Sequence, residues 1–291
     1  KNSLNEKDFF KFLNAQYNKA RSAAPDLINE APRIDARFIT DFCKRLKLQE
    51  GIFYKSIGTL GGGNHFIEYG EDTETSAGWL TIHCGSRNLG AKVANHWHSI
   101  ANNPKRAEYI GFLCGDALNS YLSDMIIAQA YALYNHHIIR DRSLVIIKKL
   151  NKARCVESIV TTHNYIAVDE EYPILRKGAI DASEGRKLCI PFNMRDGIAI
   201  CIGKGCEKWL NTAPHGAGRL MSRAQAKKQI QLYDFEQSMN GIFSTSVCDG
   251  TLDESPQAYK PMDEILSLIE PTVDVFSMVK PRLNIKDIPK S

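Results

Sequence analysis

The sequence lacks several features that would place it in a specialised class of protein. Its 291 residues contain no apolar run long enough to span a bilayer, no secretory signal pattern, no internal repeat and no low-complexity segment. Charge of one sign is not concentrated either, because 37 Lys and Arg against 33 Asp and Glu leave a formal net charge of +4. This mild excess suits an anionic substrate but excludes a strongly basic tail that coats nucleic acid.

Paired cysteine motifs are also missing. The eight cysteines are scattered along the chain without a CxxC pair. In a chain of this length we interpret them as reduced thiols of a cytosolic or nuclear compartment, and we expect a cytoplasmic protein with no membrane partner. The chain begins with Lys1 instead of methionine, so we expect a fragment or a processed form.

The apolar pattern indicates a mixture of helices and strands. With 43% hydrophobic residues, the chain can bury a large core. Helical spacing is found at residues 4–27 and 37–48, and residues 119–150 predict a long helix followed by another element. Strand-like runs are residues 79–84, 156–168 and 197–205. Because no linker separates two halves, we predict a single α+β domain over residues 1–291, with a mixed sheet and peripheral helices.

Three histidines lie at the ends of strands or in glycine-rich turns. They are His65 in "GTLGGGNHFIE", His83 in "IHCGSRNLG" and His163 in "TTHNY". Neutral imidazoles bind divalent ions such as Mn²⁺ and Zn²⁺, so these three predict a metal site, although each alone could be a hydrogen-bonded histidine in a turn. Cys84 would point to the opposite face of a strand from His83, so we favour His83 alone.

The glycine-rich stretch from Gly58 to Glu68 matches neither a Walker loop nor a Rossmann fingerprint. Its exposed amides and Asn64 would suit a phosphate-bearing ligand. The carboxylate of Glu68 would repel phosphate, so we expect it to face the hydrogen-bond donor edge of a base. Guanine, with its N1 and N2 hydrogens, has such an edge.

The stretch "TAPHGAGRLMSR" surrounds His215 with proline, glycine and arginine. A turn followed by a solvated helix face is one interpretation. The other is a nucleophile, because a neutral imidazole nitrogen can attack a phosphate and form a covalent intermediate. If a helix begins near Gly216, its amides would face the phosphate, and Arg219 and Arg223 would lie on the same side as His215.

Together these motifs resemble the RtcB RNA-splicing ligases. The matching strings are "GTLGGGNHFIE", "HCGSR", "THNY", "RKGAIDA", "IPFNMRDG", "GKG", "APHGAGRLMSR" and "AYK", which run in family order from Gly58 over about four-fifths of the chain. The resemblance implies an enzyme that joins RNA 2′,3′-cyclic phosphate or 3′-phosphate ends to 5′-hydroxyl ends, in tRNA splicing or RNA repair. It implies GTP and one or two Mn²⁺ ions as cofactors, a guanylylated histidine, and room for an activating protein partner.

The resemblance also assigns roles to individual residues. It implies that His215 takes GMP from GTP and that His65, His83 and His163 bind the metal. The implied nucleotide contacts are Asn64, Glu68, Asn164, Lys177, Pro191, Asn193, Met194, Gly216, Ala217, Gly218, Arg219, Tyr259 and Lys286. For Lys177 a solvated side chain, for Tyr259 a core position and for Lys286 a solvated tail are the alternatives.

The chain departs from the family pattern in two places. Phe192-Asn193 stands where many members have Gly-Ser. The D-x-x-C pair that completes a two-metal site has no convincing match, since Cys43 lies in a helical pattern, so we expect roughly a hundred N-terminal residues to be absent, through fragmentation or divergence. Two other functions therefore stay open: a metal-dependent phosphoesterase that uses water as nucleophile, and an inactive RNA-binding or scaffold paralogue.

Overall fold

The computed structural model describes residues 5–28, 31–102, 111–168 and 173–288. The chain divides into two compact units. The first takes its described residues from Lys1–Thr59, Cys84–Leu150 and Tyr165–Leu175, and the second from Leu60–His83, Asn151–Asn164 and Arg176–Ser291. The single domain over residues 1–291 stays a prediction. In the described part of the chain, no helix combines the length and the apolar character needed to cross a membrane.

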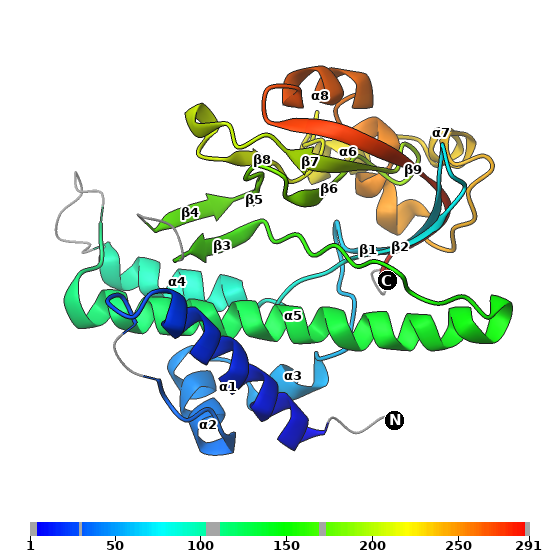
Figure 1. The fold of residues 1–291 in the computed structure, drawn as a ribbon. Coiled ribbons are helices and arrows are strands. Elements are labelled where there is room, and N and C mark those ends of the chain that lie inside the picture. Colours follow the sequence, from blue (N-terminus) through cyan, green and yellow to red (C-terminus); the bar gives the residue numbers. More distant parts are fainter. Residues whose placement is uncertain (1–4, 29–30, 103–110, 169–172, 289–291) are drawn as a thin grey trace. The chain divides into compact units, whose positions relative to one another are not determined.

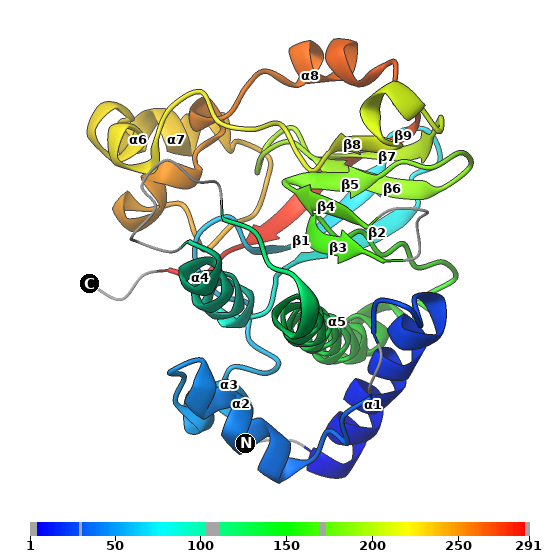
Figure 2. The ribbon, with the colours of Figure 1, turned by 90° about the vertical axis from the view of Figure 1, so that its left-hand side faces the viewer.

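The first unit is helical. Its helices are α1 (Glu6–Ala23), α2 (Ala36–Arg45), α3 (Glu50–Lys55), α4 (Leu89–Ala101) and α5 (Gly115–Asn151). The apolar spacing explains their packing, since Phe9, Leu13 and Tyr17 recur every fourth residue on one face of α1 and are buried. Figures 1 and 2 show α1 across α5, where the Tyr17 hydroxyl is 2.9 Å from that of Ser123.

Helix α5 runs unbroken for 37 residues. The sequence predicted a long helix followed by another element within residues 119–150. The predicted change of element is wrong, because the helix continues to Asn151. The reason is local: between Asp116 and Asn151 the chain has no proline or glycine to end the helix. Buried Asp124 anchors α5 to α2 and α4, because it pairs with Arg45 and accepts a 2.8 Å hydrogen bond from Trp97 Nε1. Burial raises the pKa of Asp124, and Arg45 opposes that rise.

The second unit is built on a five-stranded sheet. Its strand order is β2 (Gly78–His83), β1 (Phe66–Asp72), β9 (Val273–Ile285), β7 (Ile198–Gly203) and β6 (Lys187–Pro191). All four neighbouring pairs are antiparallel. The predicted α+β class is confirmed, whereas the sheet is antiparallel where a mixed one was expected. Outside these strands, a single bridge between Phe243 and Leu283 is parallel.

The remaining elements of this unit are short. They are β5 (Ala179–Asp181) with β8 (Thr212–Pro214), the helices α6 (Arg223–Gln229), α7 (Leu232–Ser238) and α8 (Met262–Ile269), and the 3₁₀ helices η1 (Glu207–Trp209), η2 (Asp249–Glu254) and η3 (Pro256–Ala258). A two-stranded sheet of β3 (Asn164–Ala167) and β4 (Ile174–Lys177) has its residues divided between the two units.

Strand β7 is apolar throughout because both of its faces are covered. Ile198 and Ile200 pack into one cluster with Val279, while Ala199 and Cys201 pack on the other face with α8. A strand covered on both faces needs a continuous apolar run, so the predicted strand at 197–205 is confirmed. The strand predicted at 156–168 forms only from Asn164, because no described strand pairs with residues 156–163. Val156 and Val160 in that stretch are largely exposed.

Candidate functional site

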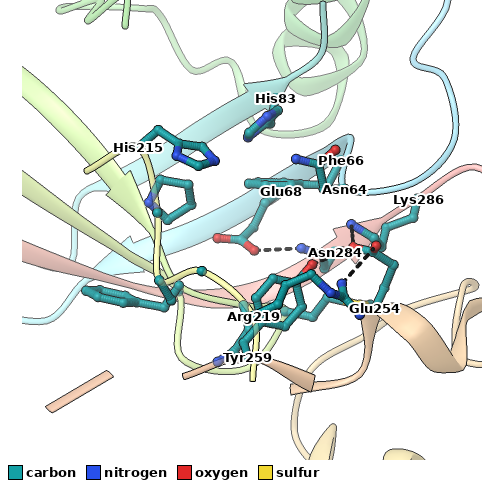
Figure 3. A pocket seen from close by; sticks show the side chains of 18 of the residues that line it. Asn64, Phe66, Glu68, His83, His215, Arg219, Glu254, Tyr259, Asn284 and Lys286 are labelled. Atoms are coloured by element: carbon teal, nitrogen blue, oxygen red, sulfur yellow. Dashed lines mark hydrogen bonds and ion pairs between the residues drawn. The ribbon is translucent and has the colours of Figure 1, made fainter. Parts of the chain in front are cut away.

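A pocket in the second unit gathers most of the residues singled out in the sequence. It encloses about 270 Å³, near the lower end of the range for small-molecule sites, roughly 300–1,000 Å³. Among the predicted residues its lining includes Asn64, Glu68, His83, Pro191, Asn193, Met194, His215, Gly216, Ala217, Gly218, Arg219, Tyr259 and Lys286. Strands β1, β2 and β9 and the segment after β8 thus contribute to a single cavity (Figure 3).

His215 follows strand β8, which pairs with β5. Its Nδ1 lies 2.7 Å from the carbonyl oxygen of Gly178. Because a carbonyl can only accept, Nδ1 donates this hydrogen bond, and in the neutral imidazole the lone pair is then on Nε2. The Gly178 amide in turn donates to Asn164 Oδ1 at 3.0 Å and to the His163 carbonyl at 2.8 Å. Asn164 therefore acts on His215 through the Gly178 peptide, and does not line the pocket.

Gly178 leads to a test of this arrangement. It adopts φ +65°, and a Cβ there would lie 3.3 Å from the His215 ring. We expect Gly178→Ala to lower the free energy of unfolding by about 1–2 kcal/mol, because alanine is strained in this region, and to displace the imidazole. Urea unfolding gives the first effect, and ¹⁵N shifts of the ring, which distinguish the two tautomers, give the second.

Gly185→Ala is the matched control, because Gly185 has φ +73° and open space where its Cβ would be. It should lose similar stability and leave the His215 ring spectrum unchanged. Identical ring spectra for Gly178→Ala and the wild type would contradict the proposed contact.

The three predicted metal histidines are neighbours in the second unit. The ring centroids of His65 and His83 are 5.9 Å apart, those of His83 and His163 5.3 Å, and those of His163 and His215 4.6 Å. His163 Nδ1 is buried without a hydrogen-bond partner. Burial, reinforced by the neighbouring histidines, lowers the pKa of His83 well below its ordinary value, and burial followed by His215 lowers that of His163 to about 4.

His83 and His163 are therefore neutral near pH 7, which is the form that binds metal. Among the residues that the structure describes, however, no group of three or more His, Cys, Asp or Glu side chains is arranged so that it could hold an ion. The histidines fit a metal in chemistry and proximity, while their convergence on one point stays a prediction.

Glu68 lies on β1 and is 2% exposed. Its Oε2 accepts a 2.7 Å hydrogen bond from Asn284 Nδ2, and its Oε1 is buried without a partner. Burial raises the pKa of Glu68 to about 8, against the opposing effects of Asn284 and Lys286. A ligand that donates a hydrogen bond to Oε1 would favour the charged carboxylate, as expected for the edge of a base.

Glu254, at the end of η2, connects several cations of the pocket. It is 3% exposed; the Tyr259 hydroxyl donates to its Oε2 at 2.8 Å, and Lys286 Nζ lies 3.1 Å from the same oxygen. Its Oε1 pairs with Arg223 and lies 3.6 Å from Arg219 Nη1. The predicted pocket residues Tyr259, Arg219 and Lys286 are thus held by one buried carboxylate that the sequence did not indicate.

The helix expected to begin near Gly216 is not formed. Residues 215–222 are irregular, and α6 begins at Arg223 behind the N-cap Ser222, whose side chain accepts from the Gln225 amide. Gly218, with φ +73°, is incompatible with a helix at this point. The two arginines consequently do not share a helix face with His215. Arg219 donates instead to the Asp253 carbonyl at 2.6 Å, and its guanidinium carbon lies 5.0 Å from the centroid of the Tyr259 ring.

Lys286 is buried, so the solvated-tail alternative is wrong. It directly follows β9, and its Nζ lies 3.3 Å from the His65 carbonyl and 5.4 Å from the Phe66 ring centroid. Burial lowers its pKa, which Glu254 counteracts. Lys177 ends β4 with an exposed side chain and does not line the pocket, so its phosphate contact stays a prediction.

All four residues of the Pro191–Met194 loop line the pocket. Phe192 is 2% exposed and belongs to the core cluster against α8. Asn193 uses its side chain within the loop, because Nδ2 donates to Asp196 and Oδ1 accepts from the Arg195 and Asp196 amides. The Pro191 carbonyl accepts from the Ala217 amide at 3.2 Å, which ties this loop to the segment after His215.

Besides Arg223, which was expected only on a helix face, sequence reasoning missed five pocket residues: Phe66, Phe192, Gly197, Glu254 and Asn284. Phe66 lies between His65 and Glu68, so strand alternation could have indicated it. Glu254 precedes the "AYK" string by four residues and carries no motif of its own. Asn284 would have required knowledge that β9 pairs with β1.

Comparison with known proteins gives a consistent result. Residues 33–287 match the family profile described as "tRNA-splicing ligase RtcB". The RNA-splicing ligase RtcB of Escherichia coli (strain K12) is 30% identical over 244 residues, which cover 77% of this chain and 59% of that protein. The tRNA-splicing ligases RtcB of Nanoarchaeum equitans and Aeropyrum pernix are 28% and 29% identical over 265 residues, covering 72% of this chain and 55% of each relative. The chain thus spans less than two thirds of the length of these curated relatives.

Proposed function

Because the chain belongs to the RtcB family of tRNA-splicing ligases, we propose that it takes part in joining RNA ends through a guanylylated His215. RNA with a 2′,3′-cyclic phosphate or 3′-phosphate and RNA with a 5′-hydroxyl would be its substrates, and GTP its source of GMP. The observation that carries this proposal is the Gly178 carbonyl at 2.7 Å from His215 Nδ1, which leaves Nε2 free at the pocket.

The first step follows from that nitrogen. Nε2 of His215 would attack the α-phosphorus of GTP, so that a P–N bond forms while the bond to the pyrophosphate oxygen breaks and pyrophosphate leaves. Where the RNA ends in a 2′,3′-cyclic phosphate, water would first open the ring by breaking the bond from phosphorus to the 2′-oxygen. An oxygen of the 3′-phosphate would next displace the histidine and leave the RNA end joined to GMP. The 5′-hydroxyl of the second RNA would then attack that 3′-phosphate, forming the new linkage and releasing GMP.

The pocket supports a guanosine nucleotide at its other side. Glu68 presents Oε1 as an acceptor without a partner, and Lys286 supplies a buried cation on the neighbouring strand end. The ring of Tyr259 is fixed between Glu254 and Arg219, which provides a rigid flat wall. Acceptor, cation and aromatic ring are the groups that a purine with N–H donors would use.

A divalent ion, Mn²⁺ by family resemblance, would be held by His65, His83 and His163. When bound, such an ion offsets the negative charge of phosphate groups next to the nucleophile. The support comes from the ring spacings of 5.9 and 5.3 Å along the three histidines and from the partnerless, buried His163 Nδ1. A ligand set of neutral nitrogen donors suits Mn²⁺ or Zn²⁺.

A ligation assay tests this function. The protein is incubated with one RNA ending in a 2′,3′-cyclic phosphate and one beginning with a 5′-hydroxyl, with GTP and Mn²⁺ both present or each omitted. We expect a joined product only when both are present, and loss of at least about 90% of the product after chelation by EDTA, because the histidines without an ion leave the phosphate charges uncompensated.

Three results would contradict the proposal. Joining without GTP would exclude guanylylation, and hydrolysis of the terminal phosphate without joining would indicate a phosphoesterase that uses water. RNA binding with neither reaction would indicate a scaffold. His98→Ala serves as a control, since His98 is exposed on α4.

A further inference from the structure

Asn284 is the buried polar side chain of the pocket that the proposed function leaves without a role. It lies on β9, is 1% exposed and lines the pocket. In the sheet register it stands directly opposite Glu68 of β1. Directly opposed residues point to the same face of an antiparallel pair, which is why the two side chains meet at the cavity (Figure 3).

The contact with Glu68 fixes the orientation of the Asn284 amide. Its Nδ2 lies 2.7 Å from Glu68 Oε2, and the charged carboxylate, which is the form that a ligand with N–H donors favours, can only accept from an NH₂ group. The carbonyl oxygen of the amide is therefore directed away from that contact. This Oδ1 is buried and has no hydrogen-bond partner.

Two acceptors on neighbouring strands are thus left without donors: Glu68 Oε1 and Asn284 Oδ1. Buried acceptors without partners are unfavourable and are rare in folded proteins, so a pair of them at one pocket points to a ligand that supplies two donors. Asn193, which lines the same pocket, differs because its amide is already occupied within its own loop.

We propose that Asn284 is a specificity residue for the nucleotide base, and that it accepts a hydrogen bond from the exocyclic 2-amino group of guanine while Glu68 accepts from N1–H. This assignment rests on the proposed guanosine nucleotide and adds a second reader of the same edge. Hypoxanthine keeps N1–H and lacks the 2-amino group, so it satisfies Glu68 and leaves Asn284 unpaired. Adenine offers no N1–H to Glu68.

The test compares GMP and IMP binding, by calorimetry, to the wild type and to Asn284→Val. The wild type should bind GMP about tenfold more tightly than IMP, the usual effect of one buried hydrogen bond whose loss leaves an acceptor unpaired. Valine fits a strand and removes the amide. In this variant the ratio of the affinity for GMP to the affinity for IMP should fall to about one.

The ratio separates base reading from a purely structural role. Valine also removes the donor to Glu68. If Asn284 only positions Glu68, this loss weakens the binding of GMP and of IMP alike, and the ratio of the two affinities stays at its wild-type value. Asn284→Thr, which keeps a hydroxyl donor for Glu68, serves if the valine variant does not fold. Asn240→Val is the matched control, because Asn240 is exposed and does not line the pocket; its ratio should equal that of the wild type.

The outcomes distinguish this inference from the function on which it rests. GMP binding with the same GMP-to-IMP ratio in the wild type and Asn284→Val would overturn the role of Asn284 and leave the guanosine site intact. A wild-type protein that does not distinguish GMP from IMP would do the same. Failure of the wild type to bind either nucleotide would overturn both the guanosine site and the role of Asn284.

Discussion

Replacing His215 by asparagine is expected to abolish the transfer of GMP from GTP to the protein, by at least about a thousandfold, because no other group replaces the attacking nitrogen. Asparagine can still donate from its amide to the Gly178 carbonyl, as His215 Nδ1 does at 2.7 Å. The fold should therefore remain within about 1 kcal/mol of the wild type. Mass spectrometry after incubation with GTP and Mn²⁺ measures the adduct, and urea unfolding measures the stability.

The chemistry of the adduct gives an independent check. A phosphoramidate of His215 should be labile in acid and stable in alkali, unlike a serine ester or an acyl phosphate. His98→Ala, on the exposed side of α4, should form the adduct at the wild-type rate. An adduct that persists in His215→Asn would show that another residue is the nucleophile.

Glu254→Gln is expected to lower the free energy of unfolding by about 3–5 kcal/mol, because it leaves buried cations without their counter-charge. Lys286, whose side chain is 3% exposed, would lose the negative charge of the carboxylate 3.1 Å from its Nζ, and Arg223 would lose one of its two paired carboxylates. Urea unfolding of the variant and the wild type measures the difference.

Glu270→Gln is the control for this comparison. Glu270 also pairs with a lysine, Lys204, at 2.9 Å, but its side chain is 73% exposed. Exposed ion pairs contribute little, so the change there should stay below about 1 kcal/mol. Equal changes in the free energy of unfolding for the two substitutions would mean that burial is not the reason why Glu254 stabilises the fold.

The sequence predicted the centre of the site because its residues lie in strings whose local order carries the information. Gly58–Glu68 and Ala213–Arg223 place Asn64, Glu68, His215 and Arg219 at one pocket, as expected. The pocket residues Glu254 and Asn284 escaped prediction for a physical reason. Asn284 meets Glu68 across 216 residues and Glu254 pairs with Arg223 across 31, and single carboxylates or amides show no periodicity.

Two local errors have different causes. The helix expected near Gly216 overlooked the glycines of "GAGR", while the true start was readable as Ser222 with Gln225 three residues later, a capping box. The strand expected from Val156 had the right composition but no partner, and strand propensity is expressed only where a neighbouring strand exists. Pairing between strands that are far apart in the sequence decides whether residues 156–163 form a strand. It also decides that Lys286, which follows β9, is buried beside β1.

The position of β9 in the sheet has a consequence for protein synthesis. This strand lies between β1 and β7, yet it is made after both of them. On a ribosome that adds about 5–20 residues per second, Glu68 waits roughly 10–40 s for Asn284 to be made. During that interval β1 has a free edge towards its missing neighbour, which is the kind of segment that chaperones protect from aggregation. The pocket is therefore completed only after β9 has been made, and a nascent chain halted before Val273 should carry the signature motifs without a site that can bind a nucleotide.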